Sequence, residues 1–220
     1  MRRFAGSALV SLLAVLISTG SAQANSITAD MHFVGPSGNN AGGVYTYAYN
    51  FSINGGPATS LICDTYENEI IRGETWKATV SGLLSGKGLF GAQALQYKAA
   101  AIIFQSILNG STNPNAGNFA IWALFSSQAS QNPFYKSSSA GAIDAWALAL
   151  AAHTPGSSLK GFVLYTPISG SESWKGHTPQ EFIGYNSKAV VPEPGSLILF
   201  GTGLVGLALT VRKKFCSTAA

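Results

Sequence analysis

An uncharged apolar run near the end of the chain most constrains which structure this sequence can form. The run extends from Leu197 to Val211 and contains three glycines. It is followed directly by three basic residues, Arg212, Lys213 and Lys214. A glycine-interrupted apolar helix is better tolerated in a membrane than in a soluble core, and basic residues mark the cytoplasmic end of such a helix. From Pro194 to Val211 the segment spans about 27 Å, close to the thickness of a bilayer core. The sequence therefore predicts a C-terminal transmembrane helix over about residues 196–211, followed by a stop-transfer tail.

The segment before this run is rich in proline. Val191-Pro192-Glu193-Pro194 lacks two backbone N–H donors, so we expect an extended, exposed spacer that joins neither a helix nor a central strand. A proline-flanked glutamate, a short glycine-rich membrane helix and a basic cluster, in this order, resemble the PEP-CTERM sorting signal of exported bacterial proteins. The resemblance covers Val190 to Phe215. It implies recognition of Pro192-Glu193-Pro194 by a membrane-embedded exosortase, removal of the helix and basic tail, and delivery of the remainder to the cell surface or extracellular matrix. An ordinary membrane anchor is the alternative.

The first residues have the three parts of a secretory signal peptide. Two arginines stand directly after the first methionine, an apolar stretch follows them, and Ala22 and Ala24 supply a small-residue cleavage site. We predict a signal peptide over residues 1–24 that uses the general secretion route. With the sorting signal at residues 190–220, the exported domain then spans residues 25–189.

The net charge of the chain lies at these two ends. Of the 13 basic residues five fall in the targeting segments, and of the nine acidic residues one does, which leaves eight of each sign in the exported domain. Nucleic-acid binding requires a clustered basic face, so the positive net charge gives no support to it. A near-neutral domain rich in Gly, Ser, Thr and Asn instead suits contact with extracellular polysaccharide or another surface protein.

The first half of the exported domain has the alternation of β-strands. Gly43 to Ile53 places aromatic residues at every second position, which predicts a strand whose aromatic row faces the core. Asn54 to Pro57 is a turn sequence that leads into a second strand over Thr59 to Asp64, so we expect a hairpin. A further strand is predicted over Glu74 to Val80.

The middle of the chain changes to helical composition. The segments with helical character are residues 93–108, 119–128 and 140–153, and strand character returns at residues 162–166 and 181–185. Strands, then helices, then strands favour an α+β fold, with an antiparallel β-rich half and a three-helix insertion. We expect Trp122 and Trp146, on separate helices, to be buried.

The sequence carries few signatures of catalysis or metal binding. The three histidines, His32, His153 and His177, lie far apart, one exported cysteine cannot form a zinc site, and no nucleophile elbow or phosphate loop is present. We therefore expect no catalytic residue, no cofactor and no metal. One cluster of acids leaves an alternative open: Asp64, Glu67, Glu69 and Glu74. Carboxylates at such spacing bind calcium or flank a glycosidic bond, so the alternative is an extracellular polysaccharide hydrolase.

Two short segments carry a second resemblance. Leu61-Ile62-Cys63-Asp64 in a strand and Asn118-Phe119-Ala120-Ile121-Trp122 at the start of a helix resemble the two signatures of bacterial thioester domains. In that family the cysteine thiol condenses with a glutamine side-chain amide, and the thioester later acylates a target surface. The resemblance gives Cys63 the thiol position and Trp122 the packing position, and it implies a thioester-domain-like scaffold.

Asn118 stands where the thioester family has glutamine. Asparagine is one methylene shorter, about 1.5 Å less reach, so we expect Cys63 to remain a thiol that Asn118 does not cross-link. Gln93, Gln105 or Gln128 could in principle substitute for Asn118, but each would have to point from a different helix or helix end towards the Cys63 strand. Cys216 lies beyond the basic tail, which leaves Cys63 without a disulfide partner in the exported domain.

Together these features predict an exported cell-surface or matrix protein with a non-enzymatic role in adhesion or assembly. Its expected partners are the export machinery, an exosortase, the inner membrane before processing, and afterwards a polysaccharide or a surface protein.

Overall fold

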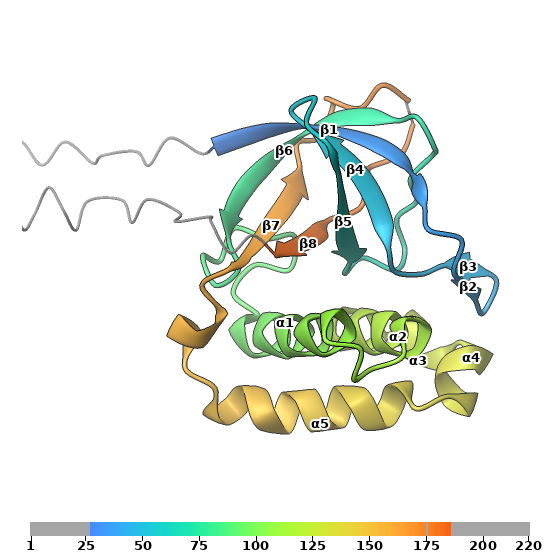
Figure 1. Ribbon diagram of the computed structural model, residues 1–220, viewed down its shortest axis with the longest axis vertical. Coiled ribbons are helices and arrows are strands. Elements are labelled where there is room, and N and C mark those ends of the chain that lie inside the picture. The colour runs from blue at the N-terminus through green and yellow to red at the C-terminus, as the bar shows by residue number, and fades with distance from the viewer. Residues whose placement is uncertain (1–26, 175, 186–220) are drawn as a thin grey trace, which may run out of the picture. The chain divides into compact units, whose positions relative to one another are not determined.

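The computed structural model describes residues 27–174 and 176–185. In this part of the chain six antiparallel strands form a closed barrel, and helices lie in layers beneath one end of it (Figure 1). The fold is therefore α+β, as predicted. Within the same residues, no helix combines the length and hydropathy needed to cross a membrane. The helix predicted over residues 196–211 lies outside the described residues.

The barrel combines strands from both sides of the helical region. In chain order its strands are β1 (Ile27–Pro36), β4 (Tyr49–Ile53), β5 (Ala58–Cys63), β6 (Thr75–Gly82), β7 (Phe162–Pro167) and β8 (Phe182–Tyr185). Around the barrel the order is β1, β4, β5, β8, β7, β6, and β6 pairs with β1 to close it. A separate small hairpin contains β2 (Asn40–Ala41) and β3 (Val44–Tyr45). The barrel is complete only when β7 and β8, which follow the helices in sequence, occupy the gap between β5 and β6.

The barrel interior is filled by aromatic rings. Phe51 lies 4.6 Å from Phe182 and 5.6 Å from Trp76, measured between ring centroids, and both contacts are edge-to-face. Met31 and Phe33, at alternate positions of β1, complete this interior. Edge-to-face packing is favourable beyond area burial alone, so this cluster fixes how the strands close on one another.

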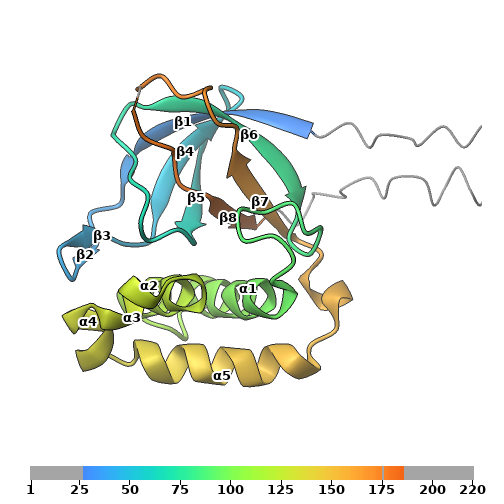
Figure 2. The same ribbon diagram turned by 180° about the vertical axis from the view of Figure 1, so that it is seen from behind.

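The helical insertion lies between β6 and β7. Its elements are α1 (Ala94–Leu108), α2 (Pro114–Phe125), α3 (Ser127–Gln131), α4 (Pro133–Ser137), α5 (Ala140–His153) and the 3-10 helix η1 (Gly156–Leu159). Helices α1 and α2 face the barrel, and α5 lies on their far side (Figures 1 and 2). The apolar composition of α1 follows from this position, since it is covered on two sides.

The helix predicted over residues 119–128 is wrong at both ends. Asn113 caps α2 by accepting from the N–H groups of Asn115 and Ala116, and Pro114 occupies the first helical position, so the helix starts before residue 119. Ser126 then adopts an extended backbone and caps α3 with its hydroxyl. The predicted three-helix insertion therefore contains two further short helices: Ser126 separates α3 from α2, and Asn132 caps α4.

Other predictions are confirmed or corrected by the strands. The hairpin is confirmed: β4 and β5 pair, and Asn54 and Gly55 both have positive φ, as a two-residue hairpin turn requires. The single strand predicted over residues 43–53 is wrong, because β3 ends at Tyr45 and β4 begins at Tyr49. Tyr45 is exposed, so the aromatic row faces the core only from Tyr47 onward.

Candidate functional site

Cys63 ends β5 and lies fully buried at the junction between the barrel and the helices. Its thiol donates to the Thr65 carbonyl oxygen at 3.1 Å, and its sulfur accepts from the Thr65 N–H at 3.4 Å. Burial is the main cause that raises the pKa of Cys63, and the neighbouring Asp64 carboxyl raises it further. The thiolate is the reactive form of cysteine, and this environment favours the neutral thiol.

Asn118 reaches this junction from the second turn of α2. Its Nδ2 donates to the Cys63 carbonyl oxygen at 2.9 Å, and its Oδ1 accepts from the Tyr47 N–H at 2.8 Å. The side chain is completely buried. Both ends of the amide are therefore bound to backbone groups. They hold α2 against Tyr47, which precedes β4, and against Cys63, the last residue of β5.

Trp122 lies one turn after Asn118 on the same helix and is also buried. Its side chain acts to lower the Cys63 pKa, against the effect of burial, but its Nε1 makes no hydrogen bond to the sulfur or to another described residue. The structure thus brings together Cys63, Asn118 and Trp122, the three residues on which the resemblance to thioester domains was based. Asn118 contacts the backbone of Cys63 and not its sulfur.

None of the three glutamines considered from the sequence reaches this junction, because Gln93, Gln105 and Gln128 are exposed. A fourth, Gln180, is buried beside it. Its Nε2 donates to the Thr65 carbonyl at 3.1 Å, the same oxygen that accepts from Cys63. No sequence signal points to Gln180, since it precedes β8 and is far from Cys63 along the chain.

A second buried group is a pair of carboxyls, Asp64 and Glu181. Glu181 accepts from the Leu89 N–H at 2.9 Å, from the Tyr97 hydroxyl at 2.7 Å and from the Thr166 hydroxyl. Asp64 accepts one hydrogen bond from the Thr65 hydroxyl at 3.1 Å, and its Oδ2 has no partner among the described residues. Burial raises the pKa of Asp64 well above its ordinary value, and the Glu181 carboxylate raises it further. These surroundings favour the neutral form of the Asp64 carboxyl.

The remaining acids of the sequence cluster do not share a site with Asp64. Glu67 accepts from the Ser126 hydroxyl, and Glu69 is exposed. Glu74 is buried, with Oε1 3.1 Å from His177 Nε2. Within the described part of the chain, no three His, Cys, Asp or Glu side chains are placed to bind a metal ion together. Asp64 and Glu74 are buried whereas Glu67 and Glu69 are exposed, so the four acids do not share one surface.

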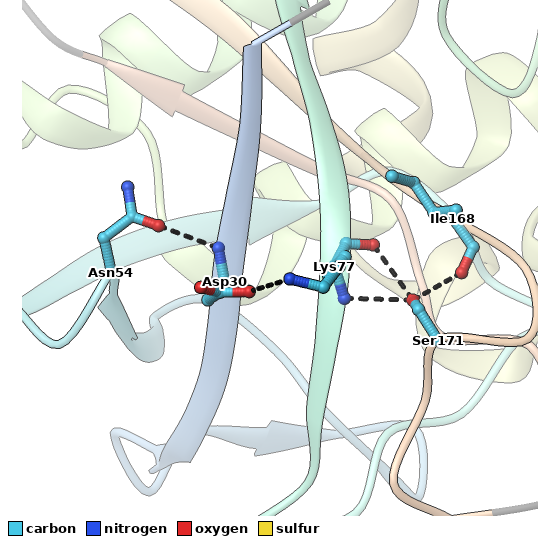
Figure 3. Close-up of polar contacts among 5 residues, drawn as sticks. All are labelled: Asp30, Asn54, Lys77, Ile168 and Ser171. Carbon is cyan, nitrogen blue, oxygen red and sulfur yellow. Dashed lines mark hydrogen bonds and ion pairs between the residues drawn. The ribbon is translucent and has the colours of Figure 1, made fainter.

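An open cleft of about 440 Å³ lies elsewhere, on the outer surface of β1 and β6. Its lining residues are Asp30, Met31, His32, Ser52, Gly55, Thr75, Trp76, Lys77 and Ser171. Figure 3 shows its polar framework: Asp30 and Lys77 form an ion pair of 2.8 Å across the two strands, and Asn54 accepts from the Asp30 N–H. Ser171 accepts from the Lys77 N–H at 3.0 Å. No sequence signal points to this cleft, because Asp30 and Lys77 become neighbours only when the barrel closes.

The targeting residues lie outside the described residues. They are the signal-cleavage residues Ala22 and Ala24, the sorting residues Val191, Pro192, Glu193 and Pro194, and the stop-transfer residues Arg212, Lys213 and Lys214.

Comparison with known proteins identifies one feature of the chain. Residues 190–214 match the family described as the PEP-CTERM protein-sorting motif. The motif implies that the protein is exported, is associated with the membrane before processing, and is processed by an exosortase. No curated protein and no solved structure matches the chain. These comparisons give no support to the thioester-domain resemblance.

Proposed function

We propose that this chain is a cell-surface or extracellular-matrix protein with a non-enzymatic role in adhesion or assembly. The observation that carries the proposal is the sorting motif at residues 190–214, because it sends the preceding domain out of the cell. The domain that is delivered must then act through its surface.

The buried polar groups support a binding role over catalysis. The side chains of Cys63, Asn118, Asp64 and Glu181 are all completely buried. Their hydrogen bonds are made with neighbouring backbone groups and side chains inside the domain. Groups in this position hold the barrel to its helices. The likeness to thioester domains remains a hypothesis about the scaffold alone, since Asn118 is engaged with two backbone groups.

The cleft on β1 and β6 supports a polysaccharide as the contact. Its two charges, Asp30 and Lys77, neutralise each other, so it does not select an anion or a cation. His32 and the hydroxyls of Ser52, Thr75 and Ser171 offer both donors and acceptors. A neutral ligand with many hydroxyl groups matches this mixture, and a shallow open cleft suits one stretch of a long chain.

The test of location is the intact mass of the protein released from the cell surface. We expect a mature form that begins near Asn25 and ends near Pro192 to Gly195, and we expect Glu193→Ala to leave a longer, membrane-held form. A released protein that still carries Arg212 to Ala220 would reduce the tail to an ordinary anchor.

The test of contact is binding of the producing strain's own purified polysaccharide, measured by calorimetry. Asp30→Asn combined with Lys77→Met is expected to lower the affinity at least tenfold, while Lys87→Met, an exposed lysine outside the cleft, leaves it unchanged. The exposed ion pair contributes only about 0 to 1 kcal/mol to folding, so the double variant should stay folded. Release of new reducing ends from the polysaccharide would favour the hydrolase alternative instead.

A further inference from the structure

Helix α5 has apolar residues on two opposite faces. Ala140, Ala147 and Ala151 are buried against the rest of the insertion. The outer face of α5 is formed by Ala142, Ala145, Trp146, Ala149 and Leu150. Trp146 is 47% exposed and Leu150 is 44% exposed. The prediction that Trp146 is buried is therefore wrong. A helix that is apolar all round is normally covered on both sides, yet α5 is the outermost layer of the insertion (Figures 1 and 2).

Small and large side chains form separate rows on the outer face of α5. Its residues follow the spacing i, i+3, i+4, i+7, i+8, so they share one side of the helix. At about 100° per residue, the three alanines form a low row and Trp146 with Leu150 forms a high row beside it. The one acid of the helix, Asp144, points elsewhere and accepts from the Tyr135 hydroxyl at 2.5 Å. Between Ala142 and Leu150 the face is thus uncharged, with a ridge next to a shallow groove, and the exposed His153 follows on the same side at the end of the helix.

We propose that the outer face of α5 binds the same face of a second copy of this chain, with the two helices parallel about a two-fold axis. A two-fold axis along the helices sets the Trp146–Leu150 row of each copy against the alanine row of the other. An antiparallel pair would instead place the two high rows against each other. Between residues 142 and 150 the two faces carry no charge, and alanines allow the helix axes to approach to about 8 Å.

The size of the face determines how strong this association is. Helix α5 has 14 residues and is about 21 Å long, so the contact is well below the roughly 800 Å² per partner of a stable complex. We therefore expect monomers in dilute solution and pairing where many copies are held on one surface at high effective concentration. In this respect the proposal rests on the assembly role proposed above, and it names the partner for that role. Copies attached to one surface share an orientation, as a parallel pair requires.

The experiment is disulfide cross-linking of the full chain on cells that display it, in a Cys216→Ser background. Ala149→Cys lies near the two-fold axis, where a thiol meets its own symmetry mate within the separation of about 7 Å between Cα atoms that a disulfide tolerates. Ala152→Cys is the matched control. Ala152 is an exposed alanine of the same helix, but it points about 60° further round the helix, away from the axis. A mild oxidant is added, and dimers are counted on a non-reducing gel.

We expect at least tenfold more dimer for Ala149→Cys than for Ala152→Cys, and we expect Trp146→Gln to remove this excess while leaving the melting temperature nearly unchanged. Equal cross-linking of the two cysteine variants, or none in either, would overturn the proposal. The same pair of variants is compared with the purified protein at high concentration. That arm does not depend on sorting, so a failure of export, read from cell fractions, is distinguished from a failure of the α5 contact.

Discussion

Replacing Asp64 by asparagine should make the free energy of unfolding less dependent on pH. The folded domain buries Asp64 completely beside Glu181, and its pKa is raised well above the ordinary carboxyl value, first by burial and then by Glu181. Asp64 is therefore protonated in the folded state at a pH where it is ionised in the unfolded chain. Since the unfolded state then binds fewer protons, stability falls as pH rises from the ordinary pKa towards the raised one.

The slope from this one proton reaches about 1.4 kcal/mol per pH unit. The side chain of the Asp64→Asn variant would stay neutral at every pH, and its amide keeps a donor and an acceptor in the place of the protonated carboxyl. We expect the stability of Asp64→Asn relative to the native chain to rise with pH above the ordinary carboxyl pKa, with that slope as the upper limit. Such a slope is large beside the roughly 5 to 15 kcal/mol typical of a folded domain.

The measurement is urea unfolding of the native protein and Asp64→Asn at pH 5, 6 and 7, analysed by linear extrapolation. Glu69→Gln serves as the control, because it removes an exposed carboxyl from the same loop. The control should follow the native protein at each pH. Parallel curves for the native protein and Asp64→Asn would refute the reasoning, since they would mean that Asp64 does not change its protonation on folding.

Three further outcomes are expected. Trp122→Ala should cost about 3 to 5 kcal/mol of stability because it leaves a cavity in a buried core. Trp146→Ala should cost about 1 kcal/mol or less because half of that side chain is already in water, and similar melting temperatures for the two would contradict the core described above. Intact mass under denaturing conditions should show no loss of ammonia and one alkylatable thiol at Cys63; a deficit that disappears in Cys63→Ala would mean that a thioester forms. If the deficit persists in an Asn118→Ala variant, Asn118 is not the amide that is consumed.

Local sequence patterns predicted the elements that depend on local chemistry. Asn54 and Gly55 tolerate positive φ, so the β4–β5 hairpin could be predicted from two residues. The predicted helix ends at residues 108 and 153 agree with the ends of α1 and α5. The start of α2 was misplaced because Asn113-Pro114 is both a turn sequence and a helix start, and only tertiary contacts decide between them.

Features that depend on distant parts of the chain were not predictable in the same way. Strand β1 was not among the predicted strands, although Ala29, Met31 and Phe33 alternate with exposed residues as in a half-buried strand. The closed barrel and the cleft both require β1 to pair with β6. The buried position of Glu181 likewise depends on Tyr97 and Thr166, which belong to a helix and a strand outside its own segment.

The pairing of β5 with β8 bears on the order of events during secretion. Ile62 pairs with Ile183, so two neighbouring strands of the barrel are separated in sequence by the whole helical insertion. Contacts of this kind form late, because a long loop must close before they contribute. In a chain that is exported from its N-terminal end, the barrel cannot close until almost all of the domain has emerged. The last strand would thus delay closure of the barrel until translocation is nearly finished.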